Sequence, residues 1–199
     1  MPVAAAESSA ARAQQRRDFF GFLCREPVRY NAKQAAPGGR GKAKDTMSGF
    51  VLNYANIKSW AERLGLAFRY SDEVGQIAVL CHVLDVDVPM VFIPRSERGM
   101  LTLAITLPFT VPPERFAEVG AALTVLNARS YMGAWILNAD KGEIYFRITV
   151  PALDVTYTDQ ALRFVAGIVA SSAETLAARL HAIAKEGAPA ASVAHPAST

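Results

Sequence analysis

The residues best suited to chemistry are three histidines and two aspartates close to one of them. His82 lies in a predicted strand, His181 late in the last predicted helix, and His195 near the C-terminus. Histidine works as a general base only beside the group it deprotonates, and none of the three belongs to a recognisable motif that pairs a base with a nucleophile. We therefore expect structural histidines and no catalytic residue. A hydrolase would instead need His82 gathered with Asp85 or Asp87 in a pocket.

Metal and phosphate binding are also weakly indicated. Asp85 and Asp87 point the same way in an extended segment and could ligate a metal, but carboxylates beside Pro89 in a predicted turn are more often solvated. Gly41-Lys42 is followed by Ala43, whereas a phosphate-binding loop has Ser or Thr there and a strand before it. The sequence has no Gly-x-Ser-x-Gly elbow and no Rossmann glycine fingerprint. The sequence thus predicts a protein that is not an enzyme and has no cofactor or metal.

The cysteines and the apolar segments indicate a cytoplasmic protein. Cys24 and Cys81 are far apart and belong to no CxxC motif, so we expect neither a disulfide framework nor a zinc site. Arg16-Arg17 precede an apolar run that ends after six residues, which is too short for an export signal. The last predicted helix is apolar but contains three charged residues, so we expect it not to span a membrane.

Positive charge is concentrated at the N-terminus. Residues 1–46 contain nine Lys and Arg against four Asp and Glu, a net charge of +5, whereas residues 47–199 contain twelve against fourteen, a net charge of −2. Residues 35–44 have the composition of a flexible linker. We interpret residues 1–46 as a basic flexible arm. If translation instead starts at Met47, these residues are not part of the native protein. Its Phe19–Leu23 cluster either packs on the domain or docks on a partner.

Residues 47–186 are predicted to form one α+β domain, and its first half is a helix followed by four strands. Asn53 is a good N-cap residue, and the apolar spacing predicts a helix over residues 53–65. The four strands are expected at residues 66–70, 76–84, 90–93 and 101–107, with a reversal over residues 85–89. Short turns between successive strands indicate an antiparallel meander.

The second half adds two helices and two strands. Pro112 opens a helix that extends to about Asn127, and strands are expected at residues 134–137 and 143–150. Thr158 then caps a long helix that runs to about Lys185. The polar face of the sheet is expected to show Thr102, Thr106, Glu143, Tyr145, Arg147 and Thr149. Residues 187–199 are expected to be a disordered tail. The order α-β-β-β-β-α-β-β-α favours a two-layer domain with a twisted antiparallel sheet.

Several short motifs carry a family resemblance between about Ile57 and Ile183. They are Glu62-Arg-Leu-Gly-Leu66, Val91-Phe-Ile93, Leu107-Pro108 with Val111-Pro-Pro-Glu-Arg115, Leu126-Asn-Ala128, and Gly133 with Gly142-Glu-Ile-Tyr-Phe-Arg147. In order and spacing the chain resembles the putative bacterial sensory transduction regulator family, or YbjN-type domains. Trp135 and Asn138 depart from the commoner pattern.

The resemblance implies a type III secretion chaperone-like fold, often dimeric, without known catalytic residues. Relatives of the family bind unfolded or extended segments of client proteins. We therefore expect a regulatory or chaperone-like protein that binds a protein partner or client, with a homodimer as a further expectation. Trp60, Phe164 and Ile168 are the candidate partner-binding residues, because aromatic and apolar anchors dominate protein interfaces. The alternative is a nucleic-acid- or membrane-associated regulator that uses the basic arm.

Overall fold

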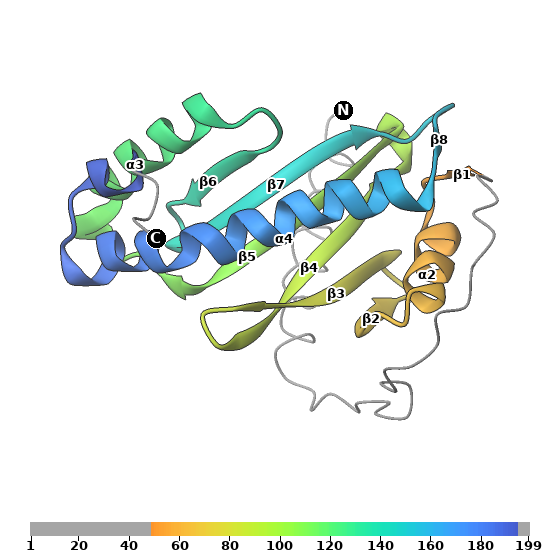
Figure 1. Ribbon diagram of the computed structural model, residues 1–199, viewed down its shortest axis with the longest axis horizontal. Helices are drawn as coiled ribbons and strands as arrows, with labels where there is room; N and C mark the ends of the chain where they lie inside the picture. The colour runs from red at the N-terminus through yellow and green to blue at the C-terminus, as the bar shows by residue number, and fades with distance from the viewer. Residues whose placement is uncertain (1–48, 195–199) are drawn as a thin grey trace, which may run out of the picture.

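A six-stranded antiparallel sheet forms the centre of the molecule (Figure 1). The computed structural model describes residues 49–194. The strand order is β2-β3-β4-β5-β7-β6. The strands are β2 (Phe68–Ser71), β3 (Gln76–Val83), β4 (Val86–Arg95), β5 (Met100–Thr110), β6 (Ala134–Asn138) and β7 (Glu143–Pro151). A separate pairing joins β1 (Phe50–Val51) to β8 (Thr156–Tyr157).

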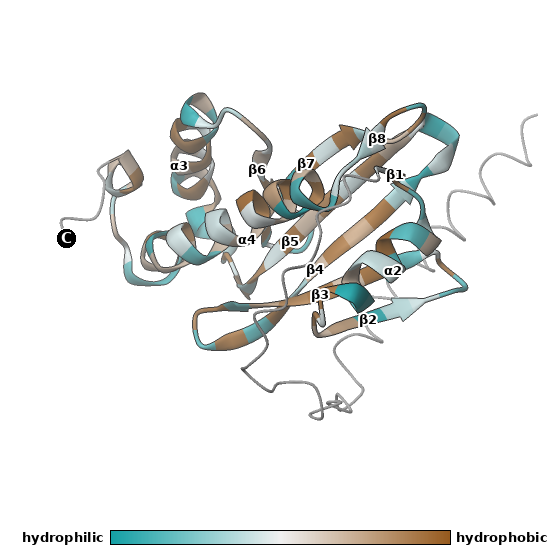
Figure 2. Ribbon diagram, turned by 45° about the vertical axis from the view of Figure 1, so that its right-hand side comes forward, coloured by the Kyte–Doolittle hydropathy of each residue, from teal (hydrophilic) through white to brown (hydrophobic). Residues whose placement is uncertain are grey.

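The helices of the described chain lie on one side of this sheet, as Figures 1 and 2 show. They are α2 (Tyr54–Arg63), α3 (Phe116–Arg129) and α4 (Asp159–His181). All three contribute buried residues to the same apolar cluster as the inward-facing strand residues. The predicted two-layer α+β fold with an antiparallel sheet is therefore confirmed.

Two of the predicted helix caps are present. The Asn53 side chain accepts a hydrogen bond from the backbone N–H of Asn56 at 2.9 Å, so α2 begins where the sequence indicated. Thr158 Oγ1 accepts from the backbone N–H of Ala161 at 3.1 Å and starts α4 in the same way. These local bonds satisfy N–H groups that the first turn of a helix leaves without partners.

The core lies between the sheet and the helices. Alternate residues of β5 and β7 are buried, as the period-two pattern predicted. Two aromatic pairs lie within it: Trp60 of α2 contacts Phe92 with ring centroids 5.8 Å apart, and Trp135 contacts Phe146 at 5.0 Å. Such pairs add to the stabilisation that comes from burial of the rings themselves. The core therefore spans the sheet from β3 to its edge at β6.

No described helix covers the opposite face of the sheet. The outward residues of β5 and β7 include Thr102 and Thr149, whose hydroxyl oxygens lie 3.1 Å apart, and the exposed Arg147. On β5 and β7 this is the polar face that the alternation predicted. On β3 and β4 the same face holds Ala78 and Val91, which pair with each other and are buried.

The reversal between the second and third predicted strands is shorter than expected. We predicted it over residues 85–89, but β4 already begins at Val86 and pairs with β3 through Pro89, which lies opposite Leu80. The turn is only two residues, Leu84 and Asp85, both with positive φ. Proline has no backbone N–H to donate to a neighbouring strand. The pairing between β4 and β5 accordingly begins only after Pro89, at Met90.

The structure describes the segment after α4 as far as residue 194. A π-helical turn (Ala182–Glu186) continues α4, and a short 3₁₀ helix (Ala190–Ala194) packs against α3, with Val193 buried. Arg115 donates from Nε and Nη2 to the carbonyl oxygen of Ile183 at 3.0 and 2.8 Å, which ties the end of the helix to the domain. The expected disorder of residues 187–199 stays a prediction.

Several predictions fall on residues that the structure does not describe. The basic arm of residues 1–46, with its Phe19–Leu23 cluster and Cys24, lies outside the described residues, as does His195. These predictions stay untested.

A candidate protein-binding surface

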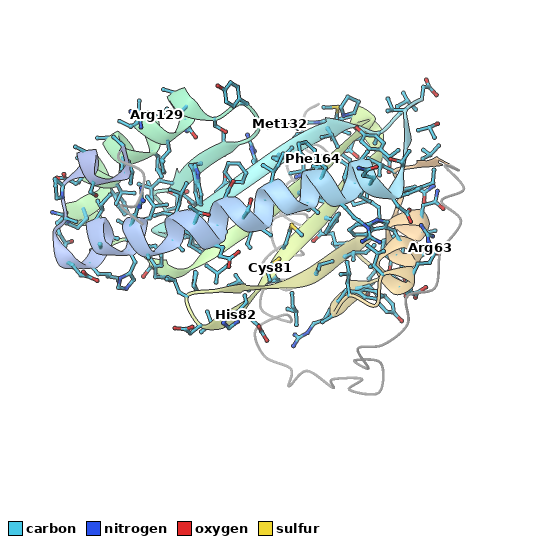
Figure 3. All side chains as sticks on the ribbon, viewed as in Figure 1. Arg63, Cys81, His82, Arg129, Met132 and Phe164 are labelled. Carbon is cyan, nitrogen blue, oxygen red and sulfur yellow. The ribbon has the colours of Figure 1, made fainter. Side chains whose placement is uncertain are left out.

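The structure does bring His82 together with Asp85 and Asp87, but at an exposed hairpin tip (Figure 3). The distances are 3.4 Å from His82 Nδ1 to Asp87 Oδ1 and 3.8 Å from Nε2 to Asp85 Oδ1. The His82 side chain is 66% exposed and that of Asp85 is fully exposed. Acid–base catalysis depends on a site that positions substrate and excludes water, and a solvated tip offers neither. The pocket that a hydrolase would require is therefore not formed around these residues.

The other candidate chemical groups are held by the fold. His181 packs edge-on against Phe109 with ring centroids 5.2 Å apart, and its Nδ1 lies 3.2 Å from Glu186 Oε1. Burial raises the pKa of the Cys81 thiol to about 11, which leaves little nucleophilic thiolate near neutral pH. In residues 49–194 no group of three or more His, Cys, Asp or Glu side chains has the arrangement of a metal site.

A small hollow lies between Leu52, the β4–β5 turn and the segment after β7. It measures about 150 Å³, and its lining includes Met100 and Leu153. Sites for drug-sized ligands and cofactors occupy about 300–1,000 Å³. The hollow is therefore too small to hold a typical cofactor, and the exposed apolar surface becomes the stronger candidate for a functional site.

The exposed large apolar residues of the described chain lie on several elements, among them α4 and the loop between α3 and β6. Phe164 on α4 is 63% exposed, and Ile168 one turn later is half-buried. Tyr131 and Met132, in the loop between α3 and β6, are fully exposed and 37% exposed, respectively. Figure 3 shows Phe164 and Met132 on the same side of the molecule. Large apolar side chains grouped on one surface often mark an interaction site.

The three predicted partner-binding residues lie in different environments. Trp60 is only 2% exposed and packs on Phe92, so it belongs to the core and cannot contact a partner without unfolding. Phe164 and Ile168 lie outside the buried stripe of α4, as their positions in the helical pattern indicated. Tyr131 and Met132 were missed, although two large apolar residues just before Gly133, outside any predicted element, were a usable signal.

The exposed positions of α4 recur along one side of the helix. They are Gln160, Arg163, Phe164, Gly167, Ser171, Glu174, Thr175 and Ala178. Apart from the helix backbone and the neighbours of Gly167 in the chain, no heavy atom lies within 4 Å of the position that a Cβ on Gly167 would occupy, so the space above the helix is open there. Phe164 is the large apolar side chain among these exposed, mostly small or polar residues. We call this outer side the α4 surface.

The apolar composition of the helix that begins with α4 also bears on membrane insertion. Residues 159–186 are long and apolar enough to cross a membrane, a weak criterion that a core helix also meets. Leu162, Val169 and Leu180 of this helix are fully buried in the domain core. Their burial favours a core helix, and the expectation that α4 does not span a membrane stays a prediction.

Comparison with known proteins identifies the family. The family model described as "Putative bacterial sensory transduction regulator" (YbjN) matches residues 53–182. The chain belongs to the YbjN family. The predicted resemblance is therefore confirmed, and the matched residues extend from the N-cap of α2 through the end of α4.

Two solved structures resemble this YbjN-family domain. The crystal structure of YbjN, a putative transcription regulator from E. coli, superposes with a TM-score of 0.53 at 15% identity and covers 70% of this chain and 96% of that one. A chain of the crystal structure of the ExsC–ExsE complex gives a TM-score of 0.48 at 17% identity, with 64% and 95% covered. No curated protein matches. At such low identity, the E. coli structure supports the fold alone.

Proposed function

We propose that this YbjN-family protein is a non-enzymatic regulatory or chaperone-like protein that binds another protein chain through the α4 surface. The observation that carries the proposal is Phe164, a large aromatic side chain that is 63% exposed on the outward side of α4. Aromatic residues are over-represented among the few side chains that dominate protein–protein affinity. The family description as a regulator agrees with a binding role.

The energy available at this position is sufficient to matter. Covering the exposed part of a phenylalanine side chain contributes about 2 kcal/mol, from the usual coefficient of roughly 25 cal/mol/Å². Ile168, one turn further along α4 and half-buried, adds apolar area beside Phe164. A partner that covers both side chains would bury apolar surface at two neighbouring points of one helix.

Affinity capture from the native cell tests the proposal. Full-length wild type and Phe164→Ser are compared with Tyr70→Ser, a matched control that removes an aromatic residue, 45% exposed, from β2. We expect specific co-purifying proteins to be lost with Phe164→Ser and retained with Tyr70→Ser. Equal capture by all three proteins would contradict a binding role for the α4 surface.

Stability measurements separate binding from folding. Phe164→Ser should leave the free energy of unfolding within about 0.5 kcal/mol of wild type, because the side chain is largely in solvent. Trp60→Ala should lower it by about 3–5 kcal/mol, because the buried ring leaves a cavity against Phe92. Chemical denaturation followed by far-UV circular dichroism measures both values.

A further inference from the structure

The sheet face opposite the helices has a buried centre on β3 and β4. Ala78 and Val91 pair with each other across these two strands and are 0% and 1% exposed. Gln76, two residues before Ala78 and therefore on the same face of β3, is 7% exposed. Leu80 and Ile93 lie beside them on this face and are partly buried. We call Gln76, Ala78, Leu80, Val91 and Ile93 the outer strip.

No described helix accounts for the burial of the outer strip. The residues beside Val91 on the neighbouring strands are Ala78 and Ala104, whose side chains end at Cβ and cannot extend over a valine. The apolar side chains of residues 49–194 that pack on Ala78 and Val91 are Val74 and Ile93, and both are themselves only partly buried. Helices α2, α3 and α4 lie on the other side of the sheet (Figure 1).

The burial is confined to one part of this face. Arg147 and Thr149 of β7 point to the same side of the sheet and are exposed. Arg147 is flanked by Ala104 and Ala134, so its neighbours on the adjacent strands are as small as those of Val91. The cover over β3 and β4 is therefore a short segment and not a second layer across the whole sheet.

The chain itself contains a segment that fits this cover. Phe19–Leu23 holds three phenylalanines and a leucine in five residues, and it belongs to an arm with a net charge of +5, whereas residues 47–199 carry −2. Opposite net charges favour association of the two parts. Residues 24–48 connect the segment to Gly49, the first described residue, which precedes β1.

The length of this connection permits the contact. Residues 24–48 span up to about 80 Å when extended, at roughly 3.3 Å per residue. The longest strand of the sheet, β5, has 11 residues and is about 36 Å long. The tether therefore reaches any part of the outer face, and it holds the segment at an effective concentration in the millimolar range.

We propose that the Phe19–Leu23 segment of this chain packs on the outer strip and covers it. The inference goes beyond the proposed function, because the outer strip and the α4 surface lie on opposite sides of the sheet (Figure 1). An apolar area left open on a sheet is a contact site for other chains. The arm shields this area, and a partner that binds the outer strip has to displace the arm first.

Photo-crosslinking tests which residues the segment contacts. Full-length protein in which Phe20 is replaced by the photoreactive p-benzoylphenylalanine is irradiated as an equal mixture of nitrogen-15-labelled and unlabelled chains. Mass spectrometry then maps the crosslinked peptides. We expect crosslinks within residues 74–93, between peptides of the same isotope composition. The same replacement at Tyr131, an exposed residue of the α3–β6 loop, is the control and should give no crosslink to the outer strip.

Cysteine labelling measures the cover independently. In a Cys24→Ser/Cys81→Ala background of the full-length protein, Ile93→Cys places a single thiol on the outer strip. Thr149→Cys, in the same background, places one on the exposed part of the same face and is the matched control. The rate of reaction with a thiol reagent then reports how accessible each position is.

Loss of the aromatic rings of the arm should uncover the outer strip. Phe20→Ser/Phe22→Ser should raise the labelling rate at position 93 on the order of tenfold and leave position 149 unchanged, because the burial of two rings is lost. An unchanged rate at position 93, or an equal rise at both positions, would overturn the inference. Crosslinks from position 20 that miss residues 74–93, or that join chains of different isotope composition, would overturn it as well. The Phe164→Ser capture experiment is independent of all these results, so the proposed function stands or falls separately.

Discussion

The side chain of Asn127 pairs with the backbone of the edge strand β6 on the side away from β7. Removal of this side chain is the most informative test of the fold. Its side chain donates from Nδ2 to the carbonyl oxygen of Trp135 at 2.9 Å and accepts from the Trp135 N–H at 2.8 Å. Since β6 pairs with β7 on its other side, this amide takes the place of a strand on the open edge. Asn127→Ala removes both bonds and leaves both backbone groups unpaired.

The magnitude follows from those two bonds. An intramolecular hydrogen bond contributes about 1 kcal/mol net, and an unpaired buried polar group costs about 1–3 kcal/mol. Asn127 is itself exposed, so water partly replaces the lost amide and the cost lies toward the lower end. We expect Asn127→Ala to lower the free energy of unfolding by about 2–3 kcal/mol.

Urea denaturation followed by tryptophan fluorescence measures this change, since Trp135 packs directly on Phe146. Ala121→Ser, an exposed position on the same helix, is the matched control and should change stability by less than about 0.5 kcal/mol. Amide exchange at Trp135 should also accelerate more than exchange elsewhere in β6. If Asn127→Ala matches the control in stability and in exchange, the side-chain pairing has no energetic role.

Three further predictions concern positions where the backbone or burial is decisive. Gly133→Ala should lower the free energy of unfolding by about 2–4 kcal/mol in urea, because φ is +80° and the added Cβ would lie 2.8 Å from the Arg147 carbonyl oxygen; a loss below about 1 kcal/mol would contradict this. The double variant Leu84→Asn/Asp85→Gly should raise the free energy of unfolding by about 1 kcal/mol and the Tm by a few degrees. The reason is that φ is +51° at Leu84 and +61° at Asp85, a conformation that Asn and Gly adopt more readily. An unchanged Tm would argue against strain in the turn. In a Cys24→Ser background, Cys81 should react slowly with a thiol reagent at pH 8. Its labelling rate should rise about tenfold per pH unit up to about pH 11, because burial raises the pKa of the thiol. Fast labelling at pH 8 would show that the site opens.

The family assignment and the α4 surface have different physical bases. The family motifs include turn residues, such as Gly133 and Gly142, which the fold requires at positive φ and which therefore persist as sequence signals. Phe164 and its small neighbours satisfy no such requirement of the fold. A contact with another chain would account for the exposure of Phe164, and the proposed function rests on this residue.

Local signals in the sequence determined the helices, most of the strands and the polar face of the sheet. Asn53 and Thr158 form short-range hydrogen bonds that start helices wherever they occur, and strict alternation after Gly142 allows only one face of β7 to be buried. The resemblance in motif order was sufficient to identify the family. These features depend on residues within a few positions of one another.

Only the tertiary structure decided which apolar residues reach the surface. Trp60 and Phe164 both occupy helices, but Phe92 on β4 covers the first, whereas no described element covers the second. The placement of Ala188 and Ala190 likewise involves hydrogen bonds to Arg115 and Glu118 of a distant segment. Burial and anchoring result from contacts between segments far apart in the chain, and the period of a single helix or the composition of a tail contains no information about them.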